Sequence, residues 1–96
     1  MNHSELKSIV LDSIGVVLNR KFETLPDETR LIADLNIESI EFVDIIFEIE
    51  KRIKTELDMN LLALHLTKKS KLHLSQVRLI DLVEFIELTT ASSGQI

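Results

Sequence analysis

The sequence has no cysteine, tryptophan or tyrosine, and its 96 residues include only one proline and two glycines. Without cysteine, the protein itself can form no disulfide, thiolate metal site or cysteine nucleophile. So few turn-forming residues argue against an architecture of several β-strands. Hydrophobic residues make up 45% of the chain and aromatic residues 4%, so we expect a core of isoleucine, leucine and valine, which favours packed helices.

Charge and hydropathy narrow the class of protein further. The net charge of −5 argues against nucleic-acid binding, which needs a basic patch, and suits partners with positive surfaces. No apolar run reaches the roughly 18 residues that a membrane span needs. Residues 1–10 include the acidic Glu5 and have no apolar core, so we do not expect a signal peptide. A cytoplasmic location is the expectation that follows.

Three segments repeat apolar residues at the period of an α-helix. Asn2, with Glu5 three residues later, predicts a cap at the start of the first segment, and Ser75 predicts the N-cap of the last. The predicted fold is therefore all-α, with a single domain over residues 1–90 and a disordered tail. The predicted helices cover residues 2–18, 38–55 and 75–89, and the predicted tail covers residues 91–96.

The connections between these helices are long for a small domain, which indicates that they pack onto it. Residues 19–37 contain Pro26, which interrupts any helix there. Residues 56–74 contain a leucine-rich stretch, which predicts a short helix, followed by a small basic cluster. The first connection offers Phe22, Leu25, Leu31, Ile32, Leu35 and Ile37 to the core; the second has Leu61, Leu62, Leu64 and Leu66, then Lys68, Lys69 and Lys71.

The middle helix is strongly amphipathic when its residues are placed at helical angles. One narrow strip is acidic, and the opposite side is a broad apolar arc that we expect to be buried. Ile45 lies at the edge of the acidic strip and is expected to stay exposed, while Glu50 points into the apolar arc. The strip is formed by Glu41, Asp44 and Glu48, and the arc by Ile40, Phe42, Val43, Ile46, Phe47, Ile49 and Ile53.

Ser39 stands at the first turn of this helix, directly after a connection. The position suits an attached phosphate, because unpaired backbone N–H groups and the helix dipole both favour negative charge at a helix N-terminus. It also leaves the side chain accessible to a modifying enzyme. Serine is common at helix starts as a cap, so an ordinary structural serine is the alternative interpretation.

The segment around this serine, LIADLNIESIEFVDIIFEIEKRI, resembles the signature of acyl carrier proteins, in which an Asp-Ser-Leu triplet opens helix II. The triplet here is Glu38-Ser39-Ile40, and RLIDLVEFI near the end resembles the final helix of the family. The resemblance extends over essentially the whole chain. It implies a bundle of three long helices plus a short helix III, with an enlarged connection between helix II and the final helix.

The resemblance also implies a function for Ser39. A phosphopantetheinyl transferase would attach a 4'-phosphopantetheine arm from coenzyme A to its hydroxyl, and the thiol of the arm would hold acyl intermediates as thioesters. The chain would be a monomeric carrier, not an enzyme, serving acyl-loading and acyl-transfer or ketosynthase-type enzymes of fatty acid, lipid or related pathways. Basic residues of these partners would dock on a set formed by Glu38, Glu41, Asp44, Ile45 and Glu48.

Departures from the family pattern suggest a specialised carrier with dedicated partners. Glu38 replaces the aspartate before the serine, and Asn36 replaces a glycine. Lys51 and Arg52 stand where many carriers stay acidic. The insertion with the leucines and lysines either enlarges the core or forms a wider acyl pocket or a docking flap. These residues do not determine which acyl or aminoacyl group is carried.

Two other classes of function stay open. The departures around Ser39 are also compatible with a carrier-fold helical interaction module that has no arm. A stand-alone enzyme is disfavoured, because we find no Ser/His/Asp order, metal-ligand set or glycine-rich phosphate loop. The spacing of His3, His65 and His73 matches no ligand pattern, so we expect surface or partly packed histidines and no metal.

Overall fold

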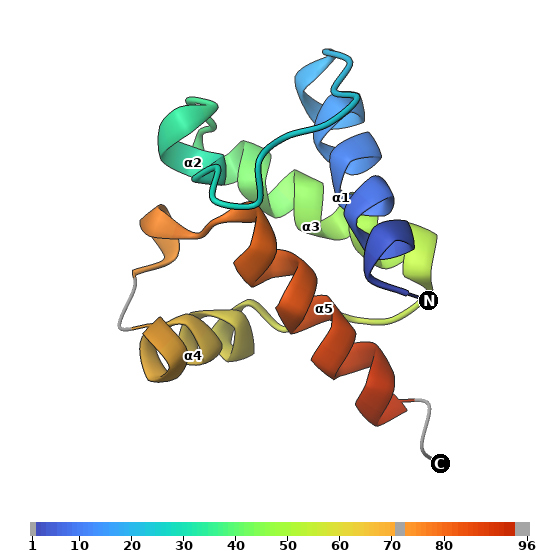
Figure 1. The fold of residues 1–96 in the computed structure, drawn as a ribbon, viewed down its shortest axis with the longest axis vertical. Helices are drawn as coiled ribbons and strands as arrows, with labels where there is room; N and C mark the ends of the chain where they lie inside the picture. Colours follow the sequence, from blue (N-terminus) through green and yellow to red (C-terminus); the bar gives the residue numbers. More distant parts are fainter. Residues whose placement is uncertain (1, 71–72, 94–96) are drawn as a thin grey trace.

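The computed structural model describes residues 2–70 and 73–93, and this part of the chain contains five α-helices and no β-strand. The all-α prediction is therefore confirmed. Figure 1 shows α5 running downward from the lower edge of α3, with α4 to one side of α5. The elements are α1 (His3–Leu18), α2 (Leu31–Asp34), α3 (Ser39–Ile53), α4 (Met59–Ser70), a 3-10 helix η1 (Leu74–Gln76) and α5 (Leu79–Ser93).

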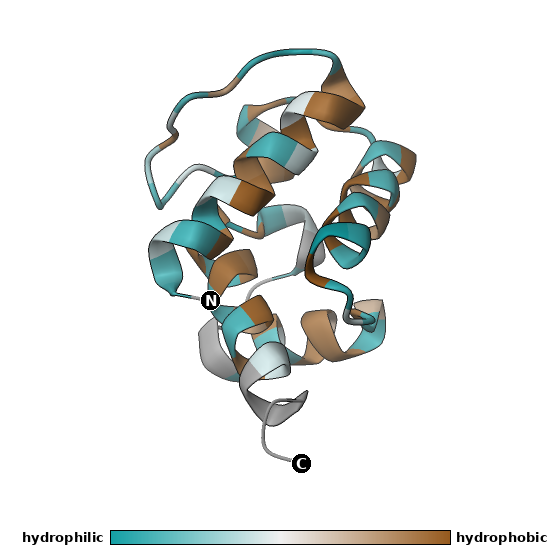
Figure 2. Cartoon of the chain, turned by 90° about the vertical axis from the view of Figure 1, so that its right-hand side faces the viewer, coloured by the Kyte–Doolittle hydropathy of each residue, from teal (hydrophilic) through white to brown (hydrophobic). Residues whose placement is uncertain are grey.

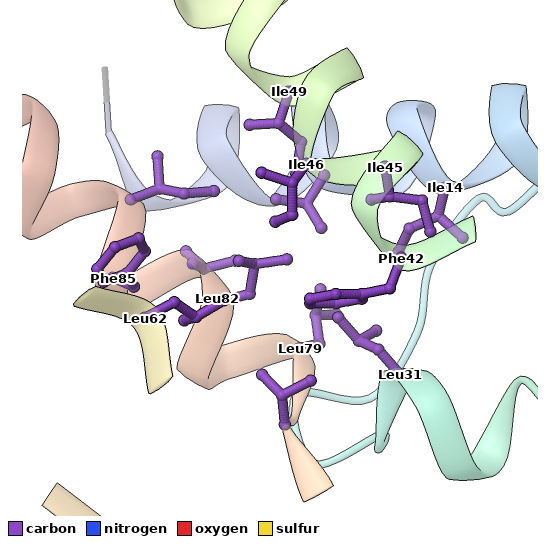
Figure 3. Close-up of a cluster of buried hydrophobic side chains, with 14 of the residues drawn as sticks. Ile14, Leu31, Phe42, Ile45, Ile46, Ile49, Leu62, Leu79, Leu82 and Phe85 are labelled. Atoms are coloured by element: carbon purple, nitrogen blue, oxygen red, sulfur yellow. The ribbon is translucent and has the colours of Figure 1, made fainter. Parts of the chain in front are cut away.

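The hydrophobic core lies where α1 packs against α3 and α5, and α4 adds to it by packing against α5. Figure 3 shows the ring of Phe42, on α3, beside Leu31 of α2 and Leu79 of α5, and all three side chains are at most 1% exposed. In Figure 2, hydrophobic and hydrophilic segments alternate along the helices, as expected when each helix buries one face. Other buried residues include Leu6, Val10, Ile14, Ile45, Ile46, Ile49, Leu62, Leu66, Leu82 and Ile86.

The first connection packs on the core as predicted. Leu31 and Ile37 are buried, and the other four residues that were predicted to pack there, Phe22, Leu25, Ile32 and Leu35, are partly buried against the core. Backbone hydrogen bonds then tie this connection to the start of α5: the N–H of Leu31 donates to Val77 O, and the N–H of Leu79 donates to Thr29 O, both at 2.9 Å. The residues that lead into α3 are thereby fixed relative to the last helix.

The helix starts were predicted with mixed success. Asn2 caps α1 as expected, since its Oδ1 accepts a hydrogen bond from the N–H of Glu5 at 2.8 Å. Ser75 is not the N-cap of the last helix: it lies in η1, and α5 begins at Leu79. The reason is Asp81, whose carboxylate accepts the N–H of Arg78 at 3.0 Å and so ends the connection at that residue.

Two element lengths also differ from prediction. A short helix was predicted in the second connection, but α4 has 12 residues and is not short. The last helix continues to Ser93, so residues 91–93 are helical and not part of a disordered tail. Residues 94–96 of the expected tail lie outside the described residues.

Candidate functional site

Ser39 is the first residue of α3, and it is exposed. The residues before it explain this placement. Ile37 is buried, and its N–H donates to Ile32 O at 3.0 Å, so the chain is anchored two residues before the serine. Glu38 is extended, with φ −77° and ψ 157°, and carries the chain outward into the helix. An anchored approach followed by an exposed serine is the geometry that an enzyme acting on the hydroxyl needs.

Asn36 gives this approach its turn. Its φ is +53°, in the left-handed region that L-residues other than asparagine, aspartate and histidine rarely adopt. This explains a departure noted in the sequence, where asparagine takes the place of a glycine: both residues tolerate the same backbone conformation. The turn is therefore kept although the residue has changed.

The N-terminal end of α3 holds two carboxylates. Glu38 is exposed, and Glu41 Oε1 accepts a hydrogen bond from the N–H of Glu38 at 2.9 Å. The first-turn amides of a helix and its dipole favour a negative group. A phosphate on Ser39 fits this helix end, but it would share it with the carboxylates of Glu38 and Glu41.

The exposed face of α3 differs from the prediction. Ile40 and Phe47 were expected in the buried arc, but they are 68% and 58% exposed. The buried stripe is narrower and consists of Phe42, Ile45, Ile46 and Ile49, because α3 packs against the rest of the protein on one side only. We define the outer row as Ile40, Asp44, Phe47 and Lys51, all of which are exposed.

Ile45 was expected to be an exposed docking residue, and this is wrong. Its side chain is 0% exposed and belongs to the hydrophobic core, as Figure 3 shows. The acidic strip that was thought to border it is itself half-buried at Glu41 and Glu48, so the buried stripe of α3 extends further toward the strip than the helical pattern indicated.

The acidic residues of the expected docking set have different surroundings. Glu41 caps the helix, as described above, and Glu48 forms ion pairs with Lys51 at 3.1 Å and Arg52 at 3.5 Å. Asp44 is exposed, and no ion pair among residues 2–70 and 73–93 involves it. Asp44 is therefore the carboxylate of this set that is most accessible to a partner, whereas Glu38 is exposed but forms a capping box with Glu41.

Glu50 has a structural role that the sequence did not reveal. Its Oε2 accepts a hydrogen bond from the N–H of Leu57 at 2.6 Å, which ties α3 to the start of the second connection. A cavity of about 460 Å³ lies beside this contact and is lined by Phe47, Glu50, Glu56, Leu57 and Asp58. Phe47 is eight residues beyond Ser39, about 12 Å along the helix, so this cavity lies beside the second half of α3 and not at Ser39.

A larger cavity, of about 610 Å³, lies away from the start of α3. It is lined by the second half of α1, residues 20–23 and Arg52. Arg20 stacks over the ring of Phe22 at 5.0 Å, and Arg52 lies 3.8 Å from Asp12. Two of its cations thus already have partners within the chain, and it contains none of the residues near Ser39.

The histidines form no site in the described part of the chain. His3 Nδ1 lies 2.7 Å from Glu87, and the ring of His65 lies 5.8 Å from that of Phe85. His73 is exposed. Within residues 2–70 and 73–93, no three histidine or acidic residues are grouped so that they could hold a metal ion. Over the same residues, no helix has both the length and the apolar character that crossing a membrane requires.

The outer row is the feature that sequence reasoning missed. A signal for it existed: at helical angles, Ile40 and Phe47 share a sector with Asp44 and Lys51, two charged residues that resist burial. Comparisons of the chain with protein-family models, with curated proteins and with solved structures gave no match, so its function has to be argued from this site.

Proposed function

We propose that this chain is an acyl carrier protein that bears a 4'-phosphopantetheine arm on Ser39. The observation that carries the proposal is the placement of Ser39, exposed as the first residue of α3 and directly behind the buried anchor Ile37. The resemblance of the sequence around this serine to the acyl carrier signature supplies the identity of the group. The helix order, with α1, α3 and α5 long and α4 between the last two, is compatible with the carrier bundle.

In this proposal, the hydroxyl oxygen of Ser39 bonds to the phosphorus that carries the pantetheine arm in coenzyme A and so forms a phosphodiester. The diphosphate bond of coenzyme A breaks, its adenosine bisphosphate leaves, and the hydroxyl proton passes to a base of the transferase. The first turn of α3 then stabilises the negative phosphate through its amides and dipole. When bound, the arm supplies a thiol that holds an acyl group as a thioester. The chain contains no thiol of its own, so the arm would provide the reactive group and the protein its position.

The surface beside Ser39 supports docking of partner enzymes. Ile40 and Phe47 offer exposed apolar contact, and Asp44 offers an exposed carboxylate close to them. Exposed apolar side chains in one row mark interaction sites more often than isolated ones. We therefore replace the expected docking set by Glu38, Ile40, Asp44 and Phe47. Transferase, acyl-loading and acyl-transfer enzymes are the proposed partners, in the cytoplasm.

The decisive experiment is attachment of the arm in vitro. Purified protein is incubated with coenzyme A and a broad-specificity phosphopantetheinyl transferase, and its intact mass is measured. We expect one arm on the native protein and on Ser8→Ala, which removes an exposed serine on α1, but none on Ser39→Ala. Failure of the native protein to gain the arm, under conditions where a known carrier is modified, overturns the proposal.

A helical interaction module without an arm is the second candidate. The two carboxylates at the start of α3 favour it, because Glu38 and Glu41 repel a phosphate placed on Ser39. Protein isolated from its native cells distinguishes the two: a carrier is recovered with the arm attached. The module is recovered unmodified, and it binds its partner equally well as native protein and as Ser39→Ala.

A further inference from the structure

The outer row of α3 has the spacing of a helix-pairing seam. Its four members follow one another at intervals of four, three and four residues, which is the spacing of core positions in coiled coils. In the single chain this seam faces solvent, and the opposite side of α3 supplies the core. Phe47, the largest side chain of the row, stands between the two charged members.

The charges of the outer row are complementary to those of a second outer row that runs in the opposite direction. Asp44 lies three residues before Phe47 and Lys51 four residues after it, about 4.5 and 6 Å along the helix axis. If two such helices pair antiparallel with Phe47 at the centre, each Asp44 comes opposite the Lys51 of the other. The small mismatch along the axis is less than the length of a lysine side chain.

We propose that a second copy of this chain pairs with the first through the outer row, antiparallel and about a two-fold axis beside Phe47. Such an interface is isologous, with the same patch used on both copies. The two Phe47 rings form its centre, and two Asp44–Lys51 ion pairs flank them. Antiparallel pairing also aligns the two helix dipoles favourably.

The monomer leaves Lys51 able to make this contact. Its Nζ lies 3.1 Å from Glu48 Oε2, but its side chain is 74% exposed and can turn toward a second carboxylate. Glu48 then keeps a cation, because Arg52 Nε lies 3.5 Å from its other oxygen. When Lys51 pairs with Asp44 of the second copy, Glu48 therefore still has Arg52 as a positive neighbour.

The charge pattern favours a second copy over a partner of one sign. A basic partner matches Asp44 but repels Lys51, and an acidic partner does the reverse, whereas the chain itself matches both. The net charge of −5 on each copy opposes the encounter, and the row has only four residues, against about 20–30 per partner in stable interfaces. The dimer is accordingly weak and depends on protein concentration.

Pairing covers the face that the proposed function assigns to partner enzymes, and Ser39 lies one residue before the row. At high protein concentration, self-association would therefore cover the docking face and block the binding of partner enzymes. The dimer itself needs no arm and no transferase, so it is tested on unmodified protein. The two proposals can therefore be told apart: the dimer can be absent from a protein that accepts the arm, and it can be present in a protein that does not accept the arm.

The test is sedimentation equilibrium with a charge swap. Between about 10 μM and 1 mM, a range that reports weak association, the native mass should rise from 11.0 kDa toward twice that value. Asp44→Lys and Lys51→Glu should each weaken the dimer by about tenfold, since each turns two ion pairs into two like-charge contacts. The double variant Asp44→Lys/Lys51→Glu should restore the native mass profile.

Phe47→Ala should abolish the dimer, whereas Leu88→Ala, which removes an equally exposed residue from α5, should leave it unchanged. Circular dichroism of each variant checks that it is folded. A native mass that stays monomeric over the whole range overturns the proposal. It is likewise overturned if the double variant stays monomeric, or if Leu88→Ala weakens the dimer as much as Phe47→Ala.

Discussion

Arg78 and Asp81 form a two-bond ion pair at the start of α5, with Arg78 Nε and Nη2 each 2.9 Å from a different oxygen of the carboxylate. The same carboxylate accepts the N–H of Arg78. Asp81 is 1% exposed, while the side chain of Arg78 is about one third exposed. Hydrogen bonding to Asp81 is the main cause that raises the pKa of Arg78, so the guanidinium is charged throughout the accessible pH range.

We predict that Asp81→Asn lowers the free energy of unfolding by about 2 kcal/mol, because it leaves a partly buried guanidinium without its carboxylate. Chemical denaturation monitored by circular dichroism measures the change. Asp34→Asn is the matched control: Asp34 accepts hydrogen bonds from Arg30 in the same way, but in solvent. It should shift the denaturation midpoint far less. Equal shifts for the two variants contradict the role assigned to burial.

Lys54 ends α3 in the left-handed region, with φ +57°. This conformation is unfavourable for a lysine and free of strain for glycine. Lys54→Gly should therefore raise the free energy of unfolding by up to about 1 kcal/mol. Lys51→Gly, three residues earlier inside the helix, should lower it by about 1 kcal/mol. If both variants destabilise the protein in urea denaturation, the strain at Lys54 is not relieved by glycine.

Acid stability should depend on the pair of Lys7 and Asp27. The hydrogen bond from Lys7 Nζ, at 2.7 Å, holds the pKa of Asp27 below its ordinary value of 3.8. A lowered folded-state pKa contributes stability that is present above pH 3.8 and is lost as the pH falls through the folded value. Lys7→Met should therefore melt at a lower temperature than native protein at pH 6, and the gap should narrow as the pH falls below 3.8, until Asp27 is protonated in both proteins.

Thermal melts of both proteins from pH 6 to pH 2 measure this gap. Lys21→Met, which removes an exposed lysine from the first connection, is the control and should show no gap that closes in acid. A gap between Lys7→Met and native protein that is constant with pH shows that packing of the lysine stem, not the charge of Asp27, is responsible.

The sequence predicted features that depend on neighbouring residues and missed those decided by packing. The cap at Asn2 was correct because a cap requires only a few residues in sequence order. The cap at Ser75 was wrong because two features set where α5 begins: the hydrogen bond from the N–H of Arg78 to Asp81, and the pairing of residues 77–80 with residues 27–31. Ser39 could be placed at a helix start from local pattern alone, whereas the partners of Glu41 and Glu48 could not.

The buried and exposed faces of α3 show most clearly what the sequence alone cannot predict. Its apolar residues occupy more than half of the helix circumference, so periodicity alone cannot tell which half is buried. The position of α1 and α5 decides this, and it buries Ile45 and exposes Ile40. The site was therefore predicted at the level of the serine and its helix, but not at the level of the surface beside it.

Exchanging isoleucine for alanine on the two sides of α3 tests this assignment. Ile45→Ala removes a fully buried side chain and should lower the free energy of unfolding by about 2–4 kcal/mol, because the cavity it leaves is surrounded by packed core. Ile40→Ala changes a side chain that is 68% exposed and should alter it by less than about 0.5 kcal/mol. Urea denaturation of the two variants gives both values.

The same two variants distinguish packing from docking. With the transferase, Ile40→Ala should lower kcat/KM for arm attachment several-fold, because its side chain lies beside Ser39 on the proposed docking face. Ile45→Ala, assayed well below its unfolding transition, should react at close to the native rate, since no surface group has changed. The opposite result, a stable Ile45→Ala protein that the transferase no longer modifies, would restore Ile45 as a docking residue and reject the burial on which the present assignment of the α3 face depends.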